Sequence, residues 1–244
     1  MASPRHSIFV ASFAALAWSA TPARADEPLL AASVTLTSDY RFRGQSQSER
    51  EAAVQGSVDY SHPSGFFGGV WASNVDFDDP QQTPLEVDVT AGFSGALSDD
   101  VTTTITLTYY WYPGAADADY DYAGLSAAIA YGPFSLLADV NLTADYADEP
   151  GTAIGLAAAV QAPLSFLNAD WLTASAEIGR QWVGDNDAYG TPDWNFYEVG
   201  LTASWDIFSL DARYSGTDLN RLECFGGTNL CQGGFVLSLT AAIS

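Results

Sequence analysis

Hydrophobic and polar residues alternate along most of the chain. Between residues 101 and 112, Val, Ile, Leu, Tyr and Trp occupy odd positions, while Thr and Tyr occupy the even ones. Successive side chains of a strand point to opposite faces, so this run predicts a strand with one apolar and one hydroxyl-lined face. The same alternation occurs in residues 33–43, 85–94, 134–146 and 195–206, and again at the end of the chain.

Clusters of Gly, Pro, Asp and Asn separate the alternating segments. We count about twelve segments, near residues 32–43, 52–61, 66–75, 84–96, 101–112, 122–132, 134–146, 152–162, 171–182, 194–206, 207–216 and 233–244. Several approach the roughly 9–11 residues that a tilted strand needs to cross a bilayer. In 171–182 strict alternation puts Arg180 on the apolar face, which predicts a bulge or a register shift there.

The connections between these segments alternate in length. Short ones are residues 62–65, 97–100 and 131–133, whereas longer, acidic ones are residues 44–51, 76–83, 113–121, 183–193 and 217–234. Short turns on one rim and long loops on the other are typical of an outer-membrane barrel. The sequence therefore predicts an all-β fold, an antiparallel transmembrane β-barrel of about 12 strands with both termini periplasmic. A soluble β-sandwich and a small soluble barrel are the alternatives.

Aromatic residues cluster near the predicted strand ends. One group surrounds a long loop, others flank a second long loop or lie by short turns: Tyr109, Tyr110, Trp111, Tyr112, Tyr120, Tyr122, Trp182, Trp194, Tyr131, Phe134, Trp205 and Phe208. Aromatic side chains favour the two membrane–water interfaces of a barrel. We interpret these residues as two interfacial girdles in contact with outer-membrane lipid.

The first 25 residues have the features of a secretory signal peptide. Arg5 gives a positive start, an apolar run covers residues 8–18, and Ala23, Arg24 and Ala25 form a small-x-small cleavage site. The apolar run is shorter than the roughly 20 residues of a membrane-spanning helix. The predicted organisation is a signal peptide at 1–25 and a barrel domain at 26–244, exported to the cell outer membrane.

The chain is strongly acidic. It has 8 Lys and Arg against 30 Asp and Glu, and without Arg5 and Arg24 its formal charge is −24. Nucleic acid is a poor partner for such a chain, whereas small cations are plausible ones. The sequence does not determine whether the barrel is a monomer or a homo-oligomer.

Catalytic and metal-binding patterns find little support. His62, the one histidine after the predicted cleavage site, lies in a short Pro/Gly turn where a general base is not expected. We expect no enzyme activity, no catalytic residue, no cofactor and no histidine/cysteine metal cluster. Cys224 and Cys231 lie seven positions apart in an exported chain, which favours a local disulfide over a metal pair.

Charged residues also occupy the predicted lumen face. These candidate lumen-lining residues are Asp39, Arg41, Arg43, Asp59, Glu86, Asp88, Asp139, Glu177, Glu198, Asp211 and Arg213. Two interpretations stay open, because such charges line an aqueous path or pair with one another inside a plugged barrel. The acidic loops include Asp76, Asp78, Asp79, Asp117, Asp119, Asp121, Asp148, Glu149, Asp185 and Asp187, which are either solvated or hold Ca²⁺.

Two motifs resemble a known family. Ser38-Asp39-Tyr40-Arg41-Phe42-Arg43-Gly44-Gln45-Ser46-Gln47-Ser48 and Gly69-Val70-Trp71-Ala72-Ser73-Asn74-Val75-Asp76-Phe77 resemble the signatures of the TorF family, proteobacterial exported proteins of roughly 240 residues classed as porin-like. The resemblance implies an outer-membrane β-barrel that passes small solutes. By alternation, the first motif continues the first strand, with Asp39, Arg41 and Arg43 facing the lumen and Tyr40 and Phe42 facing lipid.

These patterns together predict a porin-like outer-membrane channel for the passive passage of small hydrophilic solutes, with an acidic lumen that favours cations or zwitterions. The alternative is a plugged structural or adhesive barrel whose acidic loops bind a partner or calcium.

Overall fold

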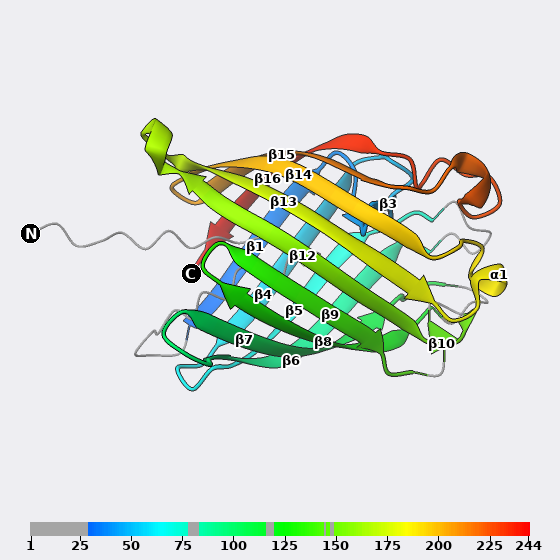
Figure 1. Cartoon of the computed structure of the whole chain (residues 1–244), viewed down its shortest axis with the longest axis horizontal. Coiled ribbons are helices and arrows are strands. Elements are labelled where there is room, and N and C mark those ends of the chain that lie inside the picture. The colour runs from blue at the N-terminus through cyan, green and yellow to red at the C-terminus, as the bar shows by residue number, and fades with distance from the viewer. Residues whose placement is uncertain (1–28, 78–82, 116–119, 144, 147–148) are drawn as a thin grey trace, which may run out of the picture.

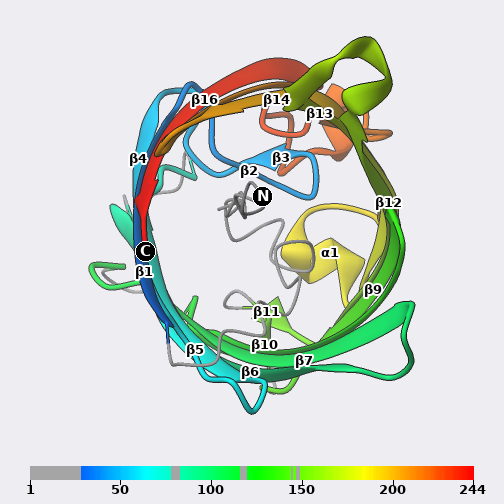
Figure 2. The ribbon, with the colours of Figure 1, turned by 90° about the vertical axis from the view of Figure 1, so that its left-hand side faces the viewer.

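Twelve antiparallel strands close into a barrel in this computed structural model (Figures 1 and 2). The structure describes residues 29–77, 83–115, 120–143, 145–146 and 149–244. The wall consists of β1 (Leu29–Thr37), β4 (Ala53–Ser61), β5 (Phe66–Asn74), β6 (Leu85–Ala96), β7 (Val101–Trp111), β8 (Tyr122–Tyr131), β9 (Phe134–Asn141), β12 (Ala153–Leu164), β13 (Ala169–Val183), β14 (Trp194–Trp205), β15 (Phe208–Thr217) and β16 (Gly234–Ile243).

Each wall strand pairs with the wall strand that follows it in the sequence, and β1 pairs with β16 to close the ring. The β1–β16 register runs from Ala32 opposite Ile243 to Thr37 opposite Ser238. Closure removes the free edges of the sheet, whose unpaired backbone groups would each cost several kcal/mol in hydrocarbon. The predicted fold class, a 12-strand antiparallel barrel, is confirmed.

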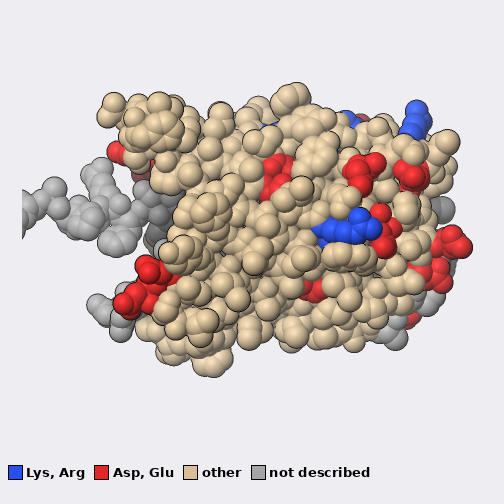
Figure 3. Space-filling model, viewed as in Figure 1, with Lys and Arg blue, Asp and Glu red and all other residues tan. Residues whose placement is uncertain are grey.

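The alternating sequence pattern separates the two faces of the wall. In β1, the outward Val34 and Leu36 are 59% and 55% exposed, whereas the inward Thr35 is 5% exposed. The outer face seen in Figure 3 is mostly uncharged, with a few acidic patches and one basic patch among the uncharged surface and further acidic side chains at both ends. No helix in the described part of the chain is long and apolar enough to cross a membrane.

The two rims differ as the connection lengths predict. Figure 1 shows the described ends of β1 and β16 at the rim of short turns, while β10 (Asp145–Tyr146) and α1 (Asn186–Tyr189) lie at the opposite rim. The short-turn rim also carries a 3-10 turn, η2 (Ser165–Leu167), in the hairpin that joins β12 to β13. The predicted signal peptide at 1–25 lies outside the described residues.

Three details of the predicted strands are wrong. The first strand ends at Thr37 rather than Arg43, and the strand expected at 134–146 ends at Asn141. No bulge occurs at Arg180, which pairs regularly with Leu156 and Asn195, so strict alternation holds there. The register shift of this hairpin lies between Pro163 and Leu164 instead. Arg180 remains outside because its guanidinium is stabilised by Asp193, 3.8 Å away, and by the Trp182 ring.

The loop between β1 and β4 turns into the barrel instead of extending outward. It contains a two-residue hairpin between β2 (Arg41–Phe42) and β3 (Gln45–Ser46). Figure 2, seen from the short-turn rim, shows this hairpin, α1, β10 and β11 (Glu149–Pro150) within the outline of the ring. The segment 38–52 is called the inner loop below, and the long-loop rim is called the external rim.

Candidate functional site in the barrel lumen

The inner loop has a backbone that its sequence specifies. Arg43 and Gly44 form the two-residue turn between β2 and β3, with φ angles of 51° and 81°. Positive φ at both central positions defines the turn that fits a tight hairpin, and glycine adopts it without steric cost. A Cβ atom at Gly44 would also collide with the carbonyl oxygen of Gly216 on β15. Glycine at this position therefore lets the hairpin tip lie against the barrel wall.

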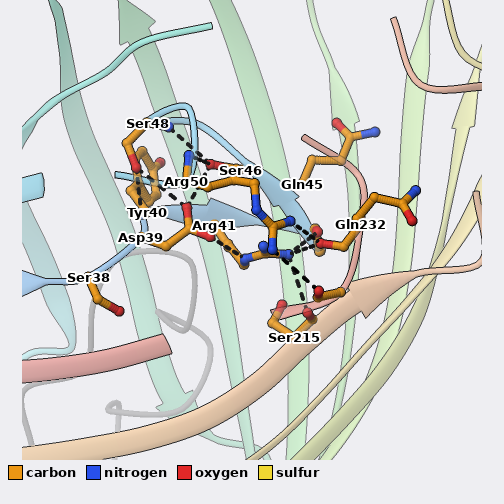
Figure 4. A network of polar contacts seen from close by, with 12 residues as sticks. Ser38, Asp39, Tyr40, Arg41, Gln45, Ser46, Ser48, Arg50, Ser215 and Gln232 are labelled. Atoms are coloured by element: carbon orange, nitrogen blue, oxygen red, sulfur yellow. Dashed lines mark hydrogen bonds and ion pairs between the residues drawn. The ribbon is translucent and has the colours of Figure 1, made fainter. Parts of the chain in front are cut away.

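Asp39 is the polar centre of the inner loop. Its Oδ2 accepts a hydrogen bond from Arg41 Nε at 2.6 Å, and its Oδ1 accepts one from Ser46 Oγ at 2.6 Å. The hydroxyl of Ser48 accepts a bond from the backbone N–H of Tyr40 at 2.9 Å. These contacts, drawn in Figure 4, join residues at both ends of the hairpin and hold it compact.

Two arginines of the inner loop bind backbone carbonyls in the C-terminal part of the chain. Arg41 Nη1 donates to the carbonyl oxygens of Ser215 at 3.3 Å and Gln232 at 2.9 Å. Arg50 Nη1 donates to the Gln232 carbonyl at 2.7 Å (Figure 4). These carbonyls belong to β15 and to the connection between β15 and β16. Hydrogen bonds from a charged donor are about twice as strong as neutral ones, so the inner loop is firmly held.

The connection that receives these arginines is cross-linked. Cys224 and Cys231 form a disulfide with a Cα–Cα distance of 5.8 Å, which confirms the predicted pairing. The same connection contains the 3-10 turn η3 (Arg221–Glu223), capped by Asn220. Both sulfur-bearing residues are fully buried in a cluster that includes Trp194 and Phe196. The disulfide therefore holds the segment whose carbonyl oxygens bind the inner loop.

Arg43 reaches from the hairpin tip to the opposite wall. Its guanidinium pairs with the Asp139 carboxylate on β9 and donates to the Gln181 side chain on β13. Burial by itself lowers the pKa of Arg43, but the charge and hydrogen bond of Asp139 together with the nearby Tyr146 and Tyr110 outweigh it, and the pKa lies above its ordinary value. A Cβ atom at Gly155 would collide with the side chains of Arg43 and Asp139. The glycine in the wall therefore leaves room for this ion pair.

Tyr40 packs inside the barrel. Its ring lies edge-on to Trp71 at a centroid distance of 5.3 Å, in a cluster with Ala53 and Val75. Burial raises the pKa of the Tyr40 phenol well above its ordinary value, and the nearby charges of Glu86 and Asp88 raise it further. The placement of Tyr40 and Phe42 against lipid was therefore wrong, because the chain leaves the wall at Thr37.

A chain of aromatic rings lines the external end of the lumen. Tyr110 stacks on Tyr122 at 4.3 Å, Tyr122 contacts Tyr146 at 4.9 Å, and Tyr146 contacts Tyr189 at 5.5 Å between centroids. Tyr189 continues to Trp194 at 6.1 Å. Tyr122 and Trp194 are buried and Tyr110 stacks on Tyr122 inside the barrel, so the assignment of these three residues to the outer girdle was wrong, whereas Tyr109 and Trp111 are exposed outside.

A cavity of about 30 Å³ lies beside this chain of rings, lined by residues that include Phe42, Arg43, Tyr110, Asp139 and Tyr146. Its volume is near that of one or two waters. Polar groups on the inner loop and on the wall therefore meet at a space large enough for solvent only.

The predicted lumen-lining residues lie at different levels. Asp39, Arg41 and Arg43 lie on the inner loop, while Glu86, Asp88 and Asp139 lie on the external halves of β6 and β9. Glu177, Glu198, Asp211 and Arg213 lie near the middle of β13, β14 and β15. Asp59 is close to the short-turn end of β4, with Ser57 Oγ donating to it at 2.8 Å.

The middle group forms a compact charged cluster. Arg213 contacts Glu198 at 3.1 Å and Asp211 at 2.6 Å. Glu177 lies directly opposite Glu198 across the β13–β14 pair. Two carboxylates thus share one guanidinium, and with Glu177 beside them the cluster keeps a negative excess in the middle of the barrel.

Several residues of the site have no obvious sequence signal. Gln181, Gly155 and the carbonyl of Gln232 bind or accommodate the inner loop, yet they belong to distant segments. Some acidic-loop positions, Asp78, Asp79, Asp117, Asp119 and Asp148, lie outside the described residues. Among the residues that the structure does describe, no three His, Cys, Asp or Glu side chains come together as metal ligands.

The closed 12-strand wall with its inward loop defines the class of small porin-like β-barrels. The chain belongs to a family described as "Bacterial protein of unknown function (Gcw_chp)", which matches residues 22–242. No curated protein sequence matches the chain.

Solved structures show the same fold. The NanC porin is similar over 87% of this chain and 99% of its own, with a TM-score of 0.60 and 10% identity. The KdgM porin is similar over 88% of this chain and all of its own, with a TM-score of 0.54 and 8% identity. A KdgM complex with disordered oligogalacturonate gives a TM-score of 0.56 at 6% identity. At these identities the likeness is one of fold.

Proposed function

We propose that the protein is an outer-membrane channel for the passive passage of small hydrophilic solutes, and that the inner loop narrows it. The observation that carries the proposal is the contrast between the outer and the inner face of the wall. Apolar side chains face outward along every strand, while hydroxyl and carboxylate groups face the lumen. Such a barrel is stable in a bilayer and presents a polar interior to water.

Three further features support this proposal. The fold resembles structures named as the NanC and KdgM porins. The motifs at residues 38–48 and 69–77 resemble the TorF family, and the first 25 residues carry the features of an exported chain. A signal peptide followed by a closed barrel with an apolar outer face is typical of the outer membrane.

The charges of the lumen favour cations or zwitterions over anions. Glu198 and Asp211 share the guanidinium of Arg213, and Glu177 and Asp59 add two further inward carboxylates. Charged side chains at close quarters in a narrow pore set its ion selectivity. We therefore expect potassium to pass more readily than chloride.

Conductance in planar bilayers tests the proposal. Refolded barrels should give discrete channels with a cation-selective reversal potential in a salt gradient, and Glu177→Gln should shift that potential toward anions. Asp99→Asn, on an exposed turn between β6 and β7, removes the same charge outside the lumen and should leave it unchanged. A barrel that refolds correctly and conducts nothing would contradict the proposal.

A second function is favoured by one observation. Arg41, Arg43 and Arg50 hold the inner loop at several points, which is also what a permanent plug requires. In that case the protein is a structural or adhesive barrel whose acidic loops bind a partner or calcium. Conductance that stays absent until the inner loop is removed would favour this alternative.

A further inference from the structure

Glu86 and Asp88 are two carboxylates without compensating charge inside the barrel. They face the lumen two residues apart on β6, and each residue is 3% exposed. Within the described part of the chain, neither takes part in an ion pair. Buried carboxylates ordinarily pair with a cation or lose their charge, and no cation of the described residues lies in contact with this pair.

Glu86 is hydrogen-bonded to Tyr40, Tyr112 and Asp88, yet one oxygen of each carboxyl group is left over. Oε2 of Glu86 and Oδ1 of Asp88 are buried, and neither accepts a hydrogen bond from the described residues. A buried acceptor left without a donor costs about 1–3 kcal/mol, and more when it is charged. These two atoms are therefore the places where a donor from outside the chain would give the greatest stabilisation.

Aromatic rings surround the two carboxylates. Asp88 lies opposite Trp71 on β5 and Tyr110 on β7, and Tyr40 lies close to both acids. Trp71 is 3% exposed and packs against Tyr40. A cation near aromatic faces gains about 0.5–2 kcal/mol, and the gain is larger when water is excluded.

We propose that Glu86 and Asp88 bind a primary ammonium group carried by a small solute that enters the lumen. This inference rests on the proposed function, since it names the class of cation that the channel admits. An ammonium group brings three N–H donors, two for the orphaned carboxylate oxygens and one for a phenol oxygen. Its alkyl part suits the rings of Trp71 and Tyr110.

A metal ion fits this place less well. Calcium takes six to eight oxygen ligands, whereas the neighbours of these carboxylates are largely aromatic. Tyr40, which lies against both acids, belongs to the inner loop and not to the wall. A displacement of Tyr40 would therefore expose the two acids while the strands stay in place.

Binding of propylammonium chloride to the refolded full-length barrel in detergent micelles tests the site. We expect saturable binding by calorimetry and a higher unfolding temperature. Sodium chloride at the same ionic strength and tetramethylammonium, which has no N–H donor, should give neither effect. Glu86→Gln and Asp88→Asn should each raise the Kd about tenfold or more, since each weakens a charge-assisted hydrogen bond. Asp99→Asn should leave the Kd unchanged.

Four results would overturn the site. Equal stabilisation by sodium indicates screening, tighter binding of calcium indicates a metal site, and an effect of pH alone indicates a proton shared by the two acids. If Asp99→Asn loses as much affinity as the Glu86 and Asp88 variants, the binding depends on the net negative charge of the whole protein and not on this site. If a variant does not refold, the comparison of propylammonium with tetramethylammonium on the unmodified protein still decides. Binding needs no open pore, so a barrel that binds without conducting contradicts only the channel.

Discussion

The two halves of the barrel interior are built in different ways. In the half near the short turns, hydroxyl groups pair across neighbouring strands, as Ser94 and Thr104 do at 3.0 Å. In the external half, charged side chains of the inner loop reach segments far along the chain. Arg43 pairs with Asp139, 96 residues away, and Arg41 binds the Gln232 carbonyl, 191 residues away.

The two kinds of contact have different consequences for the barrel. A hydroxyl pair between adjacent strands satisfies polar groups locally, and many such pairs are interchangeable. A guanidinium that bridges the lumen fixes the inner loop in one position and reduces the open cross-section of the lumen. The inner loop therefore narrows the external half of the lumen, and the other half is a polar wall.

The largest expected effect follows removal of the inner loop. Replacement of residues 40–50 by a short Gly/Ser linker leaves β1 and β4 intact, since these strands end and begin outside the replaced segment. Single-channel conductance should rise severalfold because the hairpin occupies the lumen (Figure 2). The double variant Asp99→Asn and Asp100→Asn, on the opposite rim, is the control. An unchanged conductance would show that the constriction lies elsewhere.

The next effect compares two arginines. Arg43→Gln leaves Asp139 largely buried without its partner, which costs up to about 3–5 kcal/mol of unfolding free energy, less the effect of partial exposure. Arg180→Gln on the outer face should cost about 0–1 kcal/mol, because its side chain is 40% exposed. Urea unfolding in detergent measures both. Equal losses would contradict a structural role for the bridge.

The contrast between the halves also explains what the sequence predicts. Alternation is a local property, so Thr104 and Ile105 reveal the two faces of β7 without knowledge of any other strand. The inner loop also alternates, with Tyr40 and Phe42 between Asp39, Arg41 and Arg43. Alternation alone therefore extends the first strand six residues too far. The chain leaves the wall at Thr37 because of contacts that the alternating pattern does not encode.

Those contacts are pairings between distant segments. The chain reverses direction at the turn formed by Arg43 and Gly44, and Gly44 is a local sequence signal for this turn. The carbonyls of Ser215 and Gln232 carry no sequence signature, since any residue offers the same group. Lumen-facing acids on wall strands follow from alternation, whereas the partners of Arg41 and Arg43 require the folded chain.

A smaller effect is expected from the disulfide. The double variant Cys224→Ser and Cys231→Ser should lower the unfolding free energy by about 2–3 kcal/mol, from the loop-closure entropy of a short cross-link. Because the segment also receives Arg41 and Arg50, openings to a higher conductance should become more frequent. Reduction of the unmodified protein should reproduce both results. Unchanged gating with lowered stability would separate the disulfide from the inner loop.

The smallest effect is expected in the other half. Thr104→Val keeps the shape of the side chain and leaves the Ser94 hydroxyl without this partner, so it should cost about 1 kcal/mol. Thr106→Val, two residues along the same inward face, is the matched control. A double-mutant cycle with Ser94→Ala measures the pair itself. Conductance should stay unchanged in all three variants, because these hydroxyls bind one another within the wall. A change as large as that from the inner loop would remove the distinction between the halves.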